Sequence, residues 1–154
     1  MAESNTPRWP AYGRVPPFLP VPLRARADGW TPERQARFIG LLAQTGSVAE
    51  AARAAGMSRE SAWRLRRWSG AASFAHAWDA VIALRRGKSP RDVDFPKRKI
   101  TPGELAALAD EGPFYVTLRR GRFVRAQRKP SVSALLRHLR RLDAAAVRGG
   151  WEWQ

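Results

Sequence analysis

The sequence predicts a mainly α-helical protein with one small β-hairpin, an α+β fold class. Hydrophobic residues recur at helical spacing behind Ser or Thr capping residues in several segments between residues 30 and 149. One pair of short apolar and β-branched runs flanks an Arg-Arg-Gly turn at residues 119–121. The length of 154 residues suits one domain or two very small ones. We divide the chain into an arm (1–29), a helical head (30–84), a basic linker (85–100), a small α+β tail (101–149) and a C-terminal segment (150–154).

The arm is rich in proline. Six of the twelve prolines of the chain lie before Leu23, and proline removes backbone donors and fixes φ, so neither a helix nor a central strand is expected here. Trp9, Tyr12 and Phe18 give the arm apolar groups. We therefore expect an extended segment that either docks on the domain or is held ready for a partner.

Four helices are predicted in the head. Thr31 caps the first, which ends near Gly46. Ser47 and Glu50 form a capping box that starts the second, through Ala55, and Ser58 caps a third that runs to about residue 68. The fourth has one apolar face, expected to be buried: Phe74, Ala77, Trp78, Val81 and Leu84.

The tail is predicted to be helix, β-hairpin, helix. Thr101 and Glu104 form a capping box for a helix through residue 109, and the strands cover residues 114–118 and 123–124. The last helix runs from about Ser131 to the glycines at 149 and 150. Its arginines 137, 140 and 141 are expected outward, and its apolar residues inward: Val132, Leu135, Leu136, Leu139 and Leu142.

Residues 48–67 are typical of a helix-turn-helix. Ala52 lies mid-helix where the next helix must cross closely, and Gly56 occupies a turn position that demands a left-handed backbone. Met57 and Leu65, with alanines 51, 55 and 62, are spaced to bury both helices against the first helix. The alternative is an ordinary helical hairpin in a small domain.

In a helix-turn-helix the third helix of the head would enter the major groove of DNA. Its outer side carries five candidates for contact with base edges: Arg59, Glu60, Trp63, Arg64 and Arg67. Arg59 and Arg64 suit guanine, and Glu60 suits cytosine. For Trp63, packing against the fourth helix or the arm is the alternative role.

Basic residues elsewhere are candidates for phosphate contacts. The formal net charge is +15, which favours a polyanionic partner. The head carries only +3 of it, against +5 in the linker and +6 in residues 113–129. Ser47 and Ser58, at helix starts, suit phosphate oxygens. The hairpin arginines 119, 120, 122 and 125 either follow a phosphate backbone or simply solvate the edge of the hairpin.

Residues 28–84 carry a family resemblance. The start DGWTPERQ and the phrase FAHAWDA after the third helix resemble the N-terminal DNA-binding domains of phage terminase small subunits and related uncharacterised bacterial helix-turn-helix proteins. The resemblance implies that Arg59, Glu60, Arg64 and Arg67 face DNA. The sequence departs from a terminase subunit in lacking a long coiled-coil oligomerisation helix.

Other functional classes find little support. The chain has no cysteine, no phosphate-cradling glycine loop and no metal-ligand motif, and His76 with Asp79 is a common helix-surface pair. No apolar run approaches the ~20 residues of a membrane span, and the N-terminus lacks a secretory-signal layout.

We therefore expect a non-enzymatic, cytoplasmic, nucleoid-associated protein that binds double-stranded DNA as a transcriptional regulator. No metal, cofactor or small-molecule substrate is expected, and a homo-oligomer is one expectation because one helix-turn-helix contacts few base pairs. Terminase-like DNA recognition is the alternative within the class. A protein-interaction adaptor with a solubilising basic surface is the alternative from another class.

Overall fold

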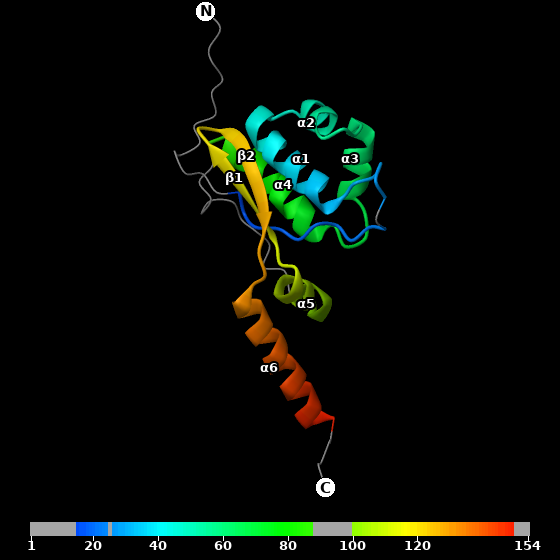
Figure 1. Cartoon of the computed structure of the whole chain (residues 1–154), viewed down its shortest axis with the longest axis vertical. Coiled ribbons are helices and arrows are strands. Elements are labelled where there is room, and N and C mark those ends of the chain that lie inside the picture. Colours follow the sequence, from blue (N-terminus) through cyan, green and yellow to red (C-terminus); the bar gives the residue numbers. More distant parts are fainter. Residues whose placement is uncertain (1–14, 25, 88–99, 150–154) are drawn as a thin grey trace, which may run out of the picture.

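The computed structural model describes residues 15–24, 26–87 and 100–149. These residues form six helices and one two-stranded antiparallel sheet, so the predicted α+β class is confirmed (Figure 1). The elements in chain order are α1 (Pro32–Thr45), α2 (Val48–Ala54), α3 (Arg59–Arg66), α4 (Ala72–Arg85), α5 (Pro102–Asp110), β1 (Phe114–Arg119), β2 (Arg122–Arg128) and α6 (Val132–Arg148).

Side-chain caps set the boundaries of α1. The Thr31 hydroxyl accepts a hydrogen bond from the Arg34 N–H at 3.2 Å, and Gly46, with φ of 71°, ends the helix in the left-handed conformation. The Arg85 guanidinium of α4 donates to the carbonyls of Ala43 and Gln44. Two of the last carbonyls of α1, which lack intrahelical partners, are thus satisfied by a side chain of α4.

The core lies between α1, α4 and the elements around them. Phe38, Ile39 and Leu42 of α1 are fully buried. The predicted inner face of α4 is buried as well, which confirms that prediction. The Phe38 and Phe74 rings stack with their centroids 6.0 Å apart, and the centroids of the Phe38 and Trp78 rings lie 4.9 Å apart. Aromatic packing therefore joins α1 to α4.

The hairpin packs on α1. Arg120 and Gly121 both have positive φ, 51° and 75°, which gives the tight two-residue turn favoured in hairpins. Gly40 of α1 allows close approach of the Phe123 ring, and Phe123 N–H donates to Gln44 Oε1 at 2.9 Å. The inner side chains of β1 belong to the same buried cluster as α1 and α4. The predicted grouping of the hairpin with a separate tail therefore differs from the structure, in which the hairpin and the helical head share one core.

The described part of the arm docks on this core. Val15, Phe18 and Val21 are buried. Phe18 pairs with Phe114 through backbone hydrogen bonds in both directions, which extends the edge of β1 by one bridge. The Leu19 N–H donates to the Ser73 hydroxyl at 2.8 Å. Of the two expectations for the arm, docking holds for residues 15–21, whereas Trp9 and Tyr12 lie outside the described residues. Most of the linker and the C-terminal segment lie outside them too.

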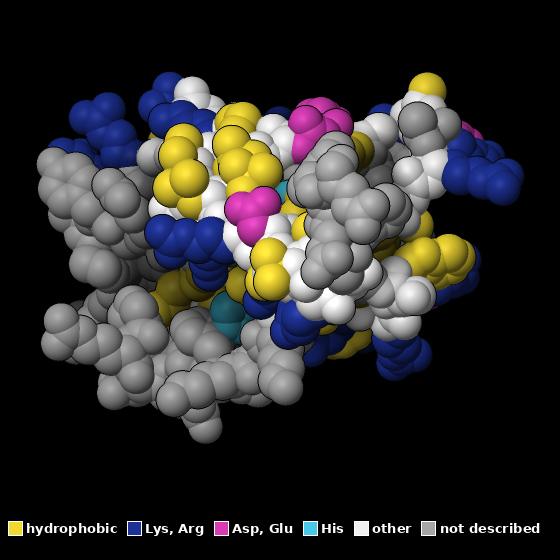
Figure 2. All heavy atoms as spheres, turned by 90° about the horizontal axis from the view of Figure 1, so that it is seen from below, with side chains coloured by type: hydrophobic (Ala, Val, Ile, Leu, Met, Phe, Trp, Pro, Cys, Tyr) yellow, Lys and Arg dark blue, Asp and Glu magenta, His cyan; other side chains and the backbone are white. Residues whose placement is uncertain are grey.

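α6 extends away from the rest of the molecule (Figure 1). It packs only on α5 among the described elements, where Ala134 is buried and the Ser131 N–H donates to the Leu108 carbonyl. The prediction that its large apolar residues point inward is wrong: Val132, Leu135, Leu136, Leu139 and Leu142 are exposed. The nine-residue α5 is too short to cover this face. Viewed from below, the surface shows hydrophobic side chains among Lys and Arg (Figure 2).

Candidate nucleic-acid interface

The turn between α2 and α3 has the backbone that the sequence predicts. The Met57 N–H donates to the Ala52 carbonyl at 2.9 Å, and Gly56 has a φ of 79°. A Cβ at Gly56 would meet no atom within 4 Å, so only the positive φ demands glycine there. Ala52 is fully buried, as expected where a neighbouring helix crosses closely. Ala52 and Gly56 therefore have the burial and the dihedral angle predicted for them, whereas Met57, expected to be buried, is only partly so.

α3 is fixed to the core through its inner side. Ala62 and Leu65 are buried. The Ser58 hydroxyl caps the helix by accepting from the Ser61 N–H at 3.1 Å. The Trp30 indole N–H donates to the Ser61 hydroxyl at 3.2 Å, which ties the start of α3 to the residue just before α1. The orientation of the outer face of α3 is therefore set by packing on one side and by a hydrogen bond at one end.

A second set of contacts fixes the end of α3 to α4. The Arg66 guanidinium pairs with the Asp79 carboxylate at 2.8 Å and lies 5.2 Å from the Trp78 ring centroid. The Trp63 ring lies 4.9 Å from that of Trp78. Of the two roles considered for Trp63, the structure shows packing on α4, and only part of the indole is exposed. Arg66 acts in the structure as a link between α3 and α4.

The five predicted base-contacting residues line a single shallow hollow. It has a volume of about 520 Å³ and is formed by Arg59, Glu60, Trp63, Arg64 and Arg67. The three arginines and Glu60 are exposed, and within the described residues none of the three arginines forms a salt bridge. Their guanidinium donors are therefore available to an external acceptor. Trp68, which sequence reasoning left without a role, follows directly and is 53% exposed.

The two predicted phosphate-binding serines are both helix caps. Ser47 Oγ accepts from the Glu50 N–H at 3.3 Å. The expected return bond of the capping box is replaced, because the Ser47 N–H donates to the Thr45 hydroxyl at 3.2 Å. An oxygen that accepts a capping bond still carries a proton that it can donate. Ser47 and Ser58 thus remain able to donate to a phosphate oxygen while they cap α2 and α3.

The hairpin arginines are exposed but lie apart from α3. The turn of the hairpin carries Arg119, Arg120 and Arg122, and Arg125 follows on β2. The sheet contacts α1, whereas α3 contacts α2 and α4, and Figure 1 shows the sheet and α3 on opposite sides of α1. The structure therefore does not bring these arginines together with the outer face of α3. Solvation of the hairpin edge remains the alternative role for them.

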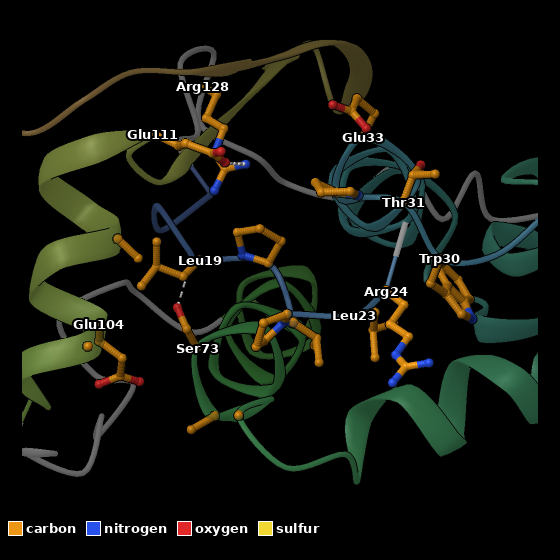
Figure 3. A pocket seen from close by; sticks show the side chains of 18 of the residues that line it. Leu19, Leu23, Arg24, Trp30, Thr31, Glu33, Ser73, Glu104, Glu111 and Arg128 are labelled. Carbon is orange, nitrogen blue, oxygen red and sulfur yellow. Dashed lines mark hydrogen bonds and ion pairs between the residues drawn. The ribbon is translucent and has the colours of Figure 1, made fainter. Parts of the chain in front are cut away.

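A larger cavity lies elsewhere on the molecule. It measures about 960 Å³ and lies between the arm, the starts of α1 and α4, and α5 (Figure 3). Its walls are largely apolar, and two of its carboxylates have structural partners: Glu104 caps α5 and Glu111 pairs with Arg128. Among the described residues that line this cavity, no two carboxylates without a partner occur together, as a pair for acid–base chemistry would require.

Within the described ranges, no three His, Asp or Glu side chains gather as a metal site would require. None of the described helices combines the length and the apolar character that crossing a membrane requires. Comparison of the chain with protein-family models, with curated proteins and with solved structures gave no match in any of the three.

Proposed function

We propose that this protein binds double-stranded DNA by placing the outer face of α3 in the major groove, in the manner of a helix-turn-helix. The observation that carries the proposal is the arrangement of α3 itself. Its inner side is fixed by Ala62, Leu65 and the Arg66–Asp79 pair. Its outer side presents three exposed arginines without a salt bridge within the described residues.

The chemistry of that face suits base edges. An arginine can donate two parallel hydrogen bonds to guanine, and a glutamate can accept from the amino group of cytosine. Arg59 and Glu60 lie in the first turn of α3 and Arg64 lies a turn further on, so they would meet neighbouring base pairs. Ser47 and Ser58, at the starts of α2 and α3, would position the helices on the phosphate backbone.

We propose transcriptional regulation as the biological use of this binding, with terminase-like recognition of a viral packaging site as the alternative. Sequence selection decides between binding with and without specificity. The full chain would be incubated with a random duplex pool, and the bound fraction sequenced after several rounds. An enriched motif of a few base pairs per head is expected, and a pool that stays random at every salt concentration would contradict base contact through α3.

A pair of double variants tests which residues carry the specificity. Arg59→Ala with Arg64→Ala is expected to relax the selected motif, since each bidentate contact to guanine contributes about 1–3 kcal/mol of discrimination. Arg140→Ala with Arg148→Ala removes the same charge from exposed positions on α6 and is the matched control. Fluorescence anisotropy over a series of salt concentrations measures both. Equal behaviour of the two double variants would show that α3 has no special role.

The adaptor alternative differs in its response to salt. A protein that neutralises several phosphates must lose affinity steeply as salt rises, because it releases counterions from DNA. An adaptor that binds an apolar protein surface would show a shallow salt dependence. Absence of any anisotropy change with micromolar protein and duplex DNA at low salt would exclude the proposed function.

A further inference from the structure

α6 carries an apolar face that no described element covers. Its large side chains are exposed by 71%, 42%, 51%, 46% and 54%, in the order Val132, Leu135, Leu136, Leu139 and Leu142. α5 contacts a different side of the helix, where Ala134 is buried. A contiguous row of exposed leucines is uncommon on a monomer and usually marks an interaction surface. We call these five side chains the leucine face.

The spacing of the leucine face matches that of paired helices. Val132, Leu135, Leu139 and Leu142 follow one another at intervals of three, four and three residues, and Ala146 continues the row by another four. This alternation is the heptad pattern in which two helices interlock their side chains. α6 has 17 residues, about 25 Å of helix at 1.5 Å per residue, so two heptads lie along it.

The charges of α6 favour a second copy as the occupant. At about 100° per residue, Arg137, Arg141 and Arg148 lie on the side opposite Leu139, and Arg140 lies about a quarter turn from it. The positions that flank the heptad row hold Leu136 and Asp143 on one side and His138 and Ala145 on the other. Two copies can therefore meet through this face without bringing arginines together, despite a net charge of +15.

An anionic membrane is the competing occupant, since basic amphipathic helices also lie on lipid surfaces. α6 fits that role less well. It has no Trp, Tyr or Phe among its residues 132–148, and Arg141 on its polar side donates to the Ile100 carbonyl at 3.1 Å instead of standing free. The regular heptad row is the feature that a lipid surface would not require.

We propose that the leucine face of α6 pairs with the leucine face of a second copy of this chain. The inference stands on the exposure and spacing of these residues and does not depend on DNA binding. A pair of chains would bury five half-exposed apolar side chains from each copy, and the two α6 helices would hold the two molecules together side by side.

Sedimentation velocity of the full chain at about 1–100 µM tests the pairing. A species of twice the 17.2 kDa of one chain is expected. Leu139→Glu would place a charge in the centre of the paired faces and weaken association by about 100-fold or more. Ala144→Glu makes the same charge change about 140° around the helix and is expected to leave the dimer intact. Because both positions are exposed, circular dichroism should show both variants folded.

A disulfide test uses the absence of native cysteine. Under mild oxidation, Leu139→Cys is expected to form a covalent dimer, whereas Ala144→Cys is expected to dimerise without a covalent link. A wild-type chain that is monomeric at 100 µM, or a dimer that Leu139→Glu does not weaken, would overturn the proposal. A monomer that instead co-sediments with phosphatidylserine vesicles through Leu139 would assign the face to a membrane.

Discussion

Gln35 is a fully buried polar side chain that joins the arm to α1. Its carbonyl oxygen accepts from the Val21 N–H at 2.7 Å, and its amide nitrogen donates to the carbonyls of Val21 at 3.1 Å and Trp30 at 3.2 Å. Val21 is itself 2% exposed. The single side chain of Gln35 therefore satisfies both backbone groups of Val21 in a place that the structure buries.

Replacement of Gln35 by Leu would leave both backbone groups of Val21 buried and without partners. Each such group costs about 1–3 kcal/mol, which sets the loss from the two groups of Val21 at about 2–6 kcal/mol if the arm stays docked. The Trp30 carbonyl loses its amide donor whether or not the arm detaches. Detachment of the arm would relieve the loss at Val21 but would expose Val15, Phe18 and Val21 to water. Exposure of each of these side chains lowers the free energy of unfolding by about 1.5–3 kcal/mol as an upper estimate. Detachment is the costlier response, so we expect the arm to stay docked in a destabilised protein.

Urea unfolding followed by circular dichroism measures the loss, and hydrogen exchange at the Val21 amide measures the local opening. Gln44→Leu is the matched control, because its Oε1 satisfies one backbone group, the Phe123 N–H, at a partly buried position. Gln44→Leu should lower the free energy of unfolding by about 1–3 kcal/mol, which is less than the loss expected for Gln35→Leu. A Gln35→Leu protein within about 0.5 kcal/mol of wild type, with the Val21 amide still protected, would refute the reasoning.

Three further substitutions follow from backbone dihedral angles and are all measured by urea unfolding. Gly46→Ala should destabilise the chain by at least about 2 kcal/mol, because φ is 71° and its Cβ would collide with the Arg85 side chain. Gly56→Ala should cost only about 1–2 kcal/mol, since its φ is 79° but the space is open; an equal cost at both glycines would contradict the role of Arg85. Arg120→Asn should stabilise the hairpin by up to about 1 kcal/mol, because Asn adopts the φ of 51° more readily, and a loss of stability would count against the turn geometry.

The sequence predicted best the features that depend on neighbouring residues. Ser58 and Thr101 begin helices because a hydroxyl caps the amide three residues later, and Gly56 marks a turn because few other residues adopt its φ. The outer face of α3 followed from the same local pattern. These signals are contained within one or two helical turns, so no tertiary information was needed to find them.

The features that the sequence did not predict depend on partners far along the chain. Phe18 bridges to Phe114, 96 positions away. Gln35 lies at helical spacing from Phe38 and Leu42, but a polar side chain gives no sign of burial until its partners on the arm are known. The inward orientation of Leu139 and its neighbours failed for a related reason. Periodicity correctly gave α6 an apolar face, but it holds no information on whether the same chain supplies the covering element.

The net charge of +15 divides in the structure between arginines with partners and arginines without. Arg66, Arg85 and Arg128 pair with a carboxylate or donate to buried carbonyls, and each joins two elements of the fold.

Exposed arginines lie on most of the described elements, and two groups of neighbouring ones are on the outer face of α3 and in the turn of the hairpin. The hollow on α3 brings three arginines together with a single acid, Glu60, which leaves a surplus of positive charge suited to an anionic partner. The hairpin differs, since its arginines flank a solvated edge. The proposed DNA contact therefore depends on α3, and the hairpin would add to affinity only where DNA extended past α1.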